Sequence, residues 1–119
     1  MHSAVQKFRA IGEPTRLRIL RILLESRGEL CVCEIVDTLR KPLYTISRNL
    51  AVLRQAGLVE ERRDGKFMMY RLHSDFLNDS LFAVLGQLPP GDPLYRRDLS
   101  ALERRRGPTG AARCVPRER

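Results

Sequence analysis

The 119-residue sequence lacks any long hydrophobic run, since no stretch approaches the roughly 18 apolar residues that a membrane-spanning helix requires. Residues 1–7 also lack the apolar core of a signal peptide. We therefore expect no membrane span and no secretion, and we predict a cytoplasmic protein. The length and the hydrophobic content of 43% fit one compact domain with a modest core.

Cysteine and histidine are scarce as well, with three and two residues. Because the cytosol is reducing, three cysteines indicate metal ligands, reactive thiols or plain buried residues rather than a disulfide framework. Neither His2 nor His73 is an evident partner for a cysteine nucleophile, so the sequence does not favour a thiol enzyme. We predict a protein without catalytic activity.

Acidic residues are outnumbered by basic ones, 14 to 22, and the net charge of +8 is unevenly spread. Residues 96–119 hold eight arginines against three acids, a composition most typical of a solvated tail. Residues 40–71 hold eight basic side chains against three acidic ones. This second excess falls within the expected ordered part of the chain and predicts contact with nucleic acid.

The spacing of apolar residues predicts four helices in the first half of the chain. A short helix ends near Gly12, and a second begins at Pro14, where proline is favourable because its missing N–H would be unpaired anyway. A third helix over 34–39 and a fourth, which buries Ile46, Leu50 and Leu53, are joined by a tight turn at 40–42. Two short helices joined in this way predict a helix-turn-helix.

A β-hairpin and two further segments follow. Asp64-Gly65 lies between the strand-like runs 58–63 and 66–72, and such a dipeptide is a strong hairpin signal because both turn residues need positive φ. Residues 76–88 predict an amphipathic fifth helix that closes the fold or pairs with another subunit. We expect residues 1–88 to form the DNA-binding and dimerisation domain and Pro89-Pro90-Gly91 to end it, with a tail over 89–119 that includes a short helix at 92–106.

Four motifs in this order resemble the ArsR/SmtB family of bacterial metal-responsive repressors, and most closely its arsenic-responsive members. They are Glu13-Pro14-Thr15-Arg16-Leu17-Arg18-Ile19-Leu20, the stretch 29–35 around Cys31-Val32-Cys33, the stretch 46–59 from Ile46-Ser47-Arg48-Asn49-Leu50, and the hairpin 64–72. The resemblance implies a mainly α fold with a small β-hairpin, a homodimeric winged helix-turn-helix. It also implies a transcriptional repressor that binds double-stranded operator DNA and uses no catalytic cofactor.

The fourth helix and the hairpin carry the residues that we expect to contact DNA. A helix that buries Ile46, Leu50 and Leu53 must expose its other face, where side chains can read bases or hold phosphates. This face comprises Tyr44, Thr45, Ser47, Arg48 and Asn49, while Arg62, Arg63 and Lys66 on the hairpin are expected to contact the DNA backbone. Pro42 stands where similar proteins place a capping Ser or Thr, which could shift the helix start and the direction of Tyr44. A dimer predicts an operator with inverted-repeat symmetry.

Cys31 and Cys33 are the predicted ligands of an inducing ion. Two residues separated by one position point about 200° apart around a regular helix, so we expect that one ion can bind both only if that turn unwinds. Their place at a helix N-terminus favours the thiolate form, which binds soft ions. The alternative from the residues alone is that both are ordinary buried residues.

The resemblance narrows the choice of ion. The fifth-helix stretch has no histidine for the interfacial zinc site of some relatives, and residues 1–10 have none of the cysteines that cadmium and lead sensors add. Thiolates without nitrogen ligands suit As(III) or Sb(III). Arsenic-sensing relatives often have a third cysteine where this chain has Val36, so the third ligand is either solvent or Cys114. The remaining alternatives are a thiol-redox-responsive repressor of the same fold and a Cd(II) or Pb(II) sensor.

Overall fold

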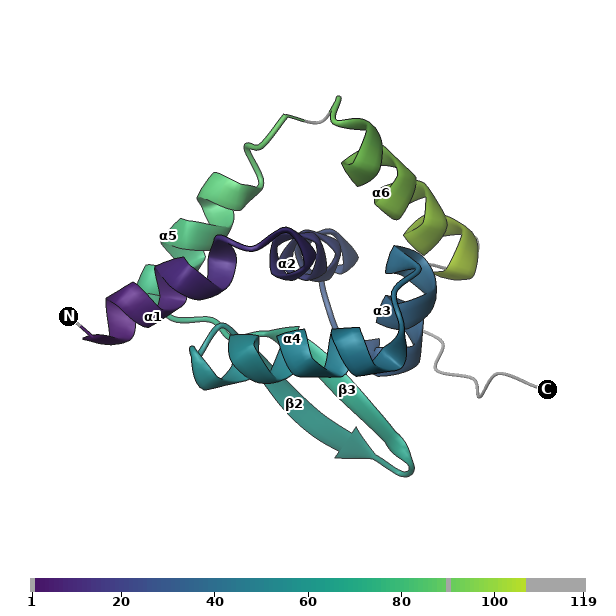
Figure 1. Cartoon of the computed structure of the whole chain (residues 1–119), viewed down its shortest axis with the longest axis horizontal. Helices are drawn as coiled ribbons and strands as arrows, with labels where there is room; N and C mark the ends of the chain where they lie inside the picture. Colours follow the sequence, from purple (N-terminus) through teal and green to yellow (C-terminus); the bar gives the residue numbers. More distant parts are fainter. Residues whose placement is uncertain (1, 90, 107–119) are drawn as a thin grey trace.

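The computed structural model describes residues 2–89 and 91–106 and shows a mainly helical molecule with one small sheet (Figure 1). Helix α2 lies at the centre, with α1 and α5 on one side of it and α3 and α6 on the other. The predicted mainly α fold with a β-hairpin is confirmed. The elements are α1 (His2–Ile11), α2 (Pro14–Ser26), β1 (Leu30–Cys31), α3 (Val32–Leu39), α4 (Leu43–Gln55), β2 (Val59–Asp64), β3 (Phe67–Leu72), α5 (Phe76–Leu85) and α6 (Pro93–Arg106).

Helix α2 supplies the centre of the core. The Glu13 carboxylate caps it by accepting a hydrogen bond from the Arg16 backbone N–H at 2.9 Å, and Pro14 occupies its first turn. Its fully buried side chains pack with those of α3 and α4, namely Ile19, Leu20, Ile22, Leu23, Ile35, Leu39, Ile46, Leu50 and Leu53. The predicted helix-turn-helix is α3 and α4, and its turn passes through Arg40 in the left-handed conformation, with φ of 55°.

The sheet has three antiparallel strands in the order β1-β3-β2. Strands β2 and β3 form the predicted wing, with Val59 opposite Leu72 and the turn at Gly65, whose φ is +64°. Strand β1 was not predicted. It pairs Leu30 with Tyr70 and Cys31 with Met69, so the segment that precedes α3 is hydrogen-bonded directly to the wing.

Helix α6 packs on the domain that the sequence predicted to end at residue 88. The predicted helix is present at Pro93–Arg106, but it packs against α2 and α3 rather than extending from the domain as a tail. Its Asp98 is only 2% exposed and accepts two hydrogen bonds of 2.9 Å from Arg18 on α2, while Leu102 joins the core. The folded unit therefore continues past Pro89-Pro90-Gly91, where the sequence predicted the end of the domain. Helix α5 is shorter than expected and ends at Leu85.

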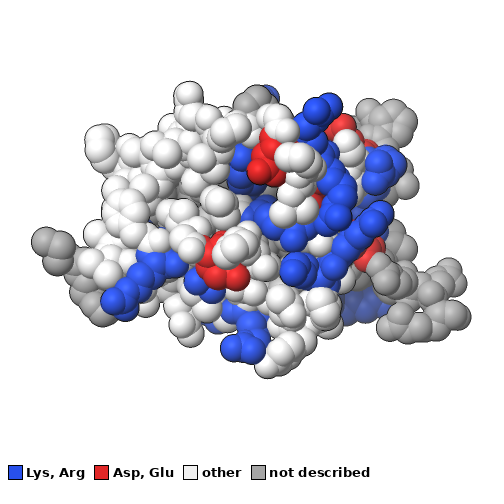
Figure 2. Space-filling model, turned by 45° about the horizontal axis from the view of Figure 1, so that its top comes forward, with Lys and Arg blue, Asp and Glu red and all other residues white. Residues whose placement is uncertain are grey.

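Charge is distributed unequally over the surface. Figure 2 shows a largely uncharged region over α1 and α5 and a concentration of basic side chains over α6. Large apolar side chains of α1 and α5 are exposed, among them Phe8, Phe76 at 92% exposure and Val84 at 62%. No helix within residues 2–89 and 91–106 has the length and apolar character needed to cross a bilayer.

Candidate nucleic-acid interface and cysteine pair

The outward face of α4 carries the predicted DNA-reading residues. Tyr44, Ser47 and Arg48 are exposed, with Tyr44 at 68%, and Thr45 is half-buried. The Arg48 guanidinium donates to the Tyr44 hydroxyl at 2.8 Å and lies 5.2 Å from its ring centroid, because residues four apart face each other on a helix. Pro42 is the N-cap and supplies no side-chain cap, yet the helix begins at Leu43 and keeps Tyr44 directed outward.

Asn49 lies differently from the other predicted contacts. It is half-buried, its Oδ1 accepts a hydrogen bond from Arg16 at 3.1 Å, and its amide donates to the Thr45 carbonyl at 2.9 Å. Arg16 also donates to the Ala10 carbonyl at 2.7 Å, so this side chain joins α1, α2 and α4. The geometry gives Asn49 a positioning role within α4. The only signal in the sequence for this role of Arg16 is its place in the motif 13–20.

The basic residues of the wing have different surroundings. Arg62 is held by Glu29 through hydrogen bonds of 2.9 and 2.6 Å, and this contact holds the pKa of the Glu29 carboxyl below its ordinary value. Arg63 and Lys66 are exposed and make no ion pair with any described residue. Because a guanidinium already paired with a carboxylate is less available to a phosphate, Arg63 and Lys66 are better placed than Arg62 to bind an anion.

A second hydrogen-bonded group supports the base of the wing. Tyr70 on β3 donates to the Glu61 carboxylate at 3.0 Å, and burial, followed by this bond, raises the pKa of Tyr70 to about 12. His73 pairs with Glu60, and hydrogen bonds from His73 and Arg71 hold the pKa of Glu60 below its usual range. These pairs join the two strands on the side where β3 leads into α5.

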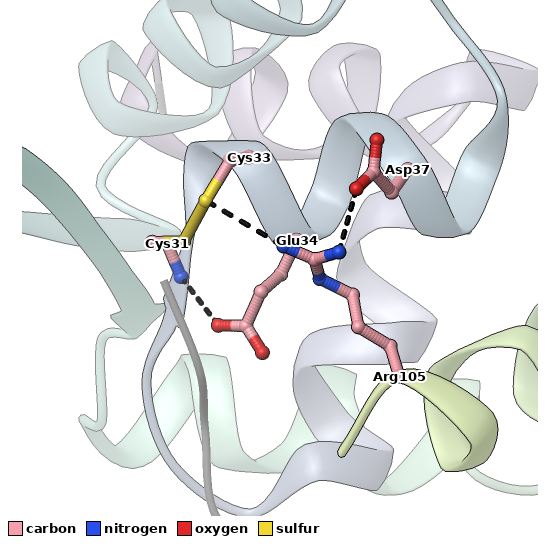
Figure 3. Close-up of a disulfide and its surroundings, with 5 residues drawn as sticks. All are labelled: Cys31, Cys33, Glu34, Asp37 and Arg105. Atoms are coloured by element: carbon pink, nitrogen blue, oxygen red, sulfur yellow. Dashed lines mark hydrogen bonds and ion pairs between the residues drawn. A yellow bond between two sulfur atoms is a disulfide. The ribbon is translucent and has the colours of Figure 1, made fainter. Parts of the chain in front are cut away.

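Cys31 and Cys33 lie at the junction of the wing and the helix-turn-helix (Figure 3). Cys31 is the N-cap of α3 and keeps the extended backbone of β1, with φ of −80° and ψ of 159°, while Cys33 belongs to the first turn of the helix. Their sulfur atoms are joined as a disulfide, and their Cα atoms are 5.4 Å apart, within the range of about 4.4–6.8 Å typical of such bonds. The expectation that the helix must unwind before both sulfurs can meet is wrong, because Cys31 precedes the helix.

The pair is surrounded by charged side chains from two helices. Glu34 is completely buried and accepts a hydrogen bond from the Cys31 backbone N–H at 3.0 Å. Arg105 on α6 donates to the Cys33 sulfur at 3.9 Å and to Asp37 at 2.6 Å. Sequence reasoning missed Arg105, because nothing in the spacing of residues relates the end of α6 to the start of α3.

The third ligand predicted from the sequence is not placed. The side chain of Val36, where relatives often have a cysteine, is partly buried against the hydrophobic core. Cys114 lies outside the described residues. Within the part of the chain that the structure describes, no group of three or more His, Cys, Asp or Glu side chains is arranged to hold a metal ion.

Comparison with known proteins identifies the family. Residues 13–61 match the model described as bacterial regulatory protein, arsR family. The chain is also 46% identical over 81 residues to the uncharacterized HTH-type transcriptional regulator MJ1325 of Methanocaldococcus jannaschii, an alignment that covers 68% of this chain and 90% of that protein. The chain belongs to the ArsR family. This ArsR-family chain is therefore a DNA-binding transcriptional regulator and not an enzyme.

Two further similarities refine the comparison. The ArsR-family chain is 44% identical over 68 residues to the arsenical resistance operon repressor of Escherichia coli, and the alignment covers 57% of each protein. It thus spans little more than half the length of that relative. It also superimposes on the homodimeric winged helix-turn-helix DNA-binding domain of Mb0332 from Mycobacterium bovis, with a TM-score of 0.63, 33% identity, and coverage of 71% of this chain and 76% of that one. The predicted winged helix-turn-helix is confirmed.

Proposed function

We propose that this ArsR-family protein is a homodimeric repressor that binds inverted-repeat operator DNA and releases it when As(III) or Sb(III) binds the thiolates of Cys31 and Cys33. The observation that carries this proposal is the convergence of the two sulfurs at the point where β1 meets α3. The arsenical resistance operon repressor, with 44% identity to this chain, supports the choice of inducer.

The chemistry of the site favours a metalloid over a divalent cation. Two thiolates from one short segment are soft donors, which suit As(III) and Sb(III). A tetrahedral zinc site needs four nitrogen or sulfur ligands, and the described residues offer no third His or Cys beside the pair. The metalloid therefore binds the two sulfurs and completes its coordination with solvent or with Cys114.

The position of the pair supplies a route from inducer to DNA. Cys31 is paired with Met69 in the wing, and Cys33 belongs to the first helix of the helix-turn-helix. One atom bound to both sulfurs fixes the distance between the end of β1 and the first turn of α3. Because β1 is paired with the wing and α3 packs with α4, this distance affects the orientation of the wing relative to α4. A coupling free energy of roughly 1–3 kcal/mol changes operator occupancy by one to two orders of magnitude, and DNA must weaken metalloid binding equally.

The DNA contacts and the dimer complete the proposal. Tyr44, Thr45, Ser47 and Arg48 on α4 face the bases, and Arg63 and Lys66 on the wing face phosphates. The exposed apolar surface of α1 and α5 is the dimer interface, as an uncharged region with Phe76 and Val84 in water indicates. Two copies related by a twofold axis place two α4 helices on two half-sites.

Fluorescence anisotropy of a labelled operator duplex tests the proposal. The reduced protein is expected to bind the duplex and to release it on addition of arsenite. The Cys31→Ser and Cys33→Ser variants should bind DNA as tightly as the wild-type protein does, and arsenite should not release them from it. Undiminished DNA binding by the wild-type protein under excess arsenite would sink the proposal.

A thiol-redox switch is a second candidate, favoured by the disulfide between Cys31 and Cys33. In this alternative, oxidation of the pair, rather than a metalloid, fixes β1 relative to α3. Anisotropy measured with the peroxide-treated and the reduced protein distinguishes the two, provided that mass spectrometry confirms the loss of two hydrogen atoms on oxidation. Equal DNA affinity in both redox states excludes the redox switch and leaves the metalloid response untouched.

A further inference from the structure

Arg105 lies beside the cysteine pair although it follows Cys33 by 72 residues in the sequence. Its Nη2 donates to the Cys33 sulfur at 3.9 Å, and its Nη1 donates to the Asp37 carboxylate at 2.6 Å (Figure 3). Asp37 is one helical turn beyond Cys33, so the ion pair holds the guanidinium over that turn of α3. The Arg105 and Asp37 side chains are 23% and 24% exposed, and the contact is less screened than a surface pair would be.

When arsenic binds only two sulfurs, its third ligand is an oxygen that can accept a hydrogen bond. As(III) binds three ligands, and Val36 cannot supply a third sulfur because it carries none and packs against the core. Arsenous acid, As(OH)₃, reacts with two thiols to form two As–S bonds, breaks two As–O bonds and releases two waters. The arsenic remains trivalent and keeps one hydroxyl group. The dithiol itself is formed from the disulfide by two electrons and two protons from a thiol or phosphine reductant.

We infer that Arg105 donates a hydrogen bond to the oxygen that remains on arsenic, and so replaces the missing third thiolate in recognition; this inference rests on the proposed function. That oxygen is only two bonds from the Cys33 sulfur, and Nη2 of Arg105 already contacts the same sulfur. The guanidinium has five N–H donors in a rigid fork, which suits it to bridge Asp37, sulfur and oxygen together.

The inference implies selectivity between two kinds of trivalent arsenical. Arsenite keeps an oxygen that accepts the hydrogen bond from Arg105. Phenylarsine oxide, which in water is C₆H₅As(OH)₂, releases both oxygens as water when the two thiols form As–S bonds, and it keeps only its phenyl group. Arg105 therefore stabilises bound arsenite and gives no such contribution to the phenyl compound.

The ratio of the two affinities provides the test. Dissociation constants for arsenite and phenylarsine oxide are measured by competition with a small dithiol, using the full-length reduced protein. In Arg105→Met the ratio of the arsenite Kd to the phenylarsine oxide Kd is expected to rise about tenfold, the usual effect of a lost hydrogen bond that involves a charged group. The exposed neighbour Arg104 is the matched control, and Arg104→Met should leave the ratio unchanged.

An unchanged ratio in Arg105→Met overturns the inference, whether or not both affinities fall together, because a purely structural role would weaken both arsenicals alike. Circular dichroism checks the folding of the variant. If Arg105→Met does not fold, Arg105→Lys keeps the charge without the fork and should raise the ratio severalfold; no change there overturns the inference equally. Failure of the wild-type protein to bind either arsenical contradicts the proposed function instead, so the two failures are distinguishable.

Discussion

At the scale of single residues, the sulfur atoms of Cys31 and Cys33 meet because the two residues belong to different elements, β1 and α3. The sequence predicted that both sulfurs are ligands, but it placed both cysteines on one helix, where their side chains would diverge. Strand β1 has only two residues, too few for an alternating pattern, so the extended conformation of Cys31 could not be predicted. The contact of Arg105 with Cys33 could not be predicted either, because it depends on how α6 packs against α3.

The two kinds of basic residue on the wing should differ in their effect on DNA binding. Lys66→Ala removes an exposed charge with no described carboxylate partner, and we expect the salt dependence of operator binding to weaken by about 0.9 in logarithmic slope for each lost phosphate contact. Arg62→Ala should change the slope much less, because Glu29 already neutralises Arg62. Anisotropy titrations across a salt series measure both slopes, and equal losses in the two variants would contradict this assignment.

The raised pKa of Tyr70 predicts a loss of folding stability at alkaline pH. Its folded-state pKa of about 12 lies above the value of about 10 expected in the unfolded chain. The stabilisation is therefore fully present below pH 10 and is lost as the pH rises from about 10 to about 12, by at most about 3 kcal/mol. Urea unfolding at pH 9 and pH 11 should show a smaller loss in Tyr70→Phe than in the wild-type protein. Identical losses would show that Tyr70 does not titrate in this way.

At the scale of elements, helix α6 shows what the sequence could and could not provide. Its N-cap Asp92, Pro93 and apolar spacing predicted the helix almost to the residue. Its docking was not predictable, because the partner of Asp98 is Arg18, eighty positions earlier, and a helix so rich in arginine resembles a solvated one. The wing and the helix-turn-helix were predictable, since their turn signals and apolar periods are local.

The ion pair between Arg18 and Asp98 should account for much of the stability that α6 provides. Asp98→Asn leaves a largely buried guanidinium without its charge partner, and we expect the free energy of unfolding to fall by about 2–3 kcal/mol. Glu103→Gln, at an exposed position on the same helix, should change it by less than about 0.5 kcal/mol. Equilibrium urea unfolding gives both values. A loss in Asp98→Asn no larger than in the control would mean that α6 contributes little.

At the scale of the whole molecule, the unequal surface suggests how the protein assembles. The uncharged face over α1 and α5 lies apart from the basic face over α6, and α4 with the wing remains accessible (Figures 1 and 2). An interface on α1 and α5 therefore leaves both DNA-reading helices free. It also leaves the cysteine pair and Arg105 outside the interface, since α3 and α6 lie on the other side of α2.

A charge placed in the proposed interface should separate the subunits. Val84→Glu puts a carboxylate among the exposed apolar side chains of α5, and we expect a monomer by analytical ultracentrifugation and a loss of operator affinity of at least tenfold. Gln87→Glu, just beyond the end of α5, is the matched control and should remain dimeric. A dimeric Val84→Glu variant would place the interface elsewhere.

The central claim is that inducer binding at Cys31 and Cys33 and DNA release are one event. Its most direct test is the titration of arsenite, antimonite, cadmium and zinc into the reduced protein on its operator, with thiolate absorbance and anisotropy recorded together. The account predicts that arsenite and antimonite change both signals with a single midpoint and that zinc changes neither. Operator binding that persists after the thiolates are saturated with arsenite would contradict it.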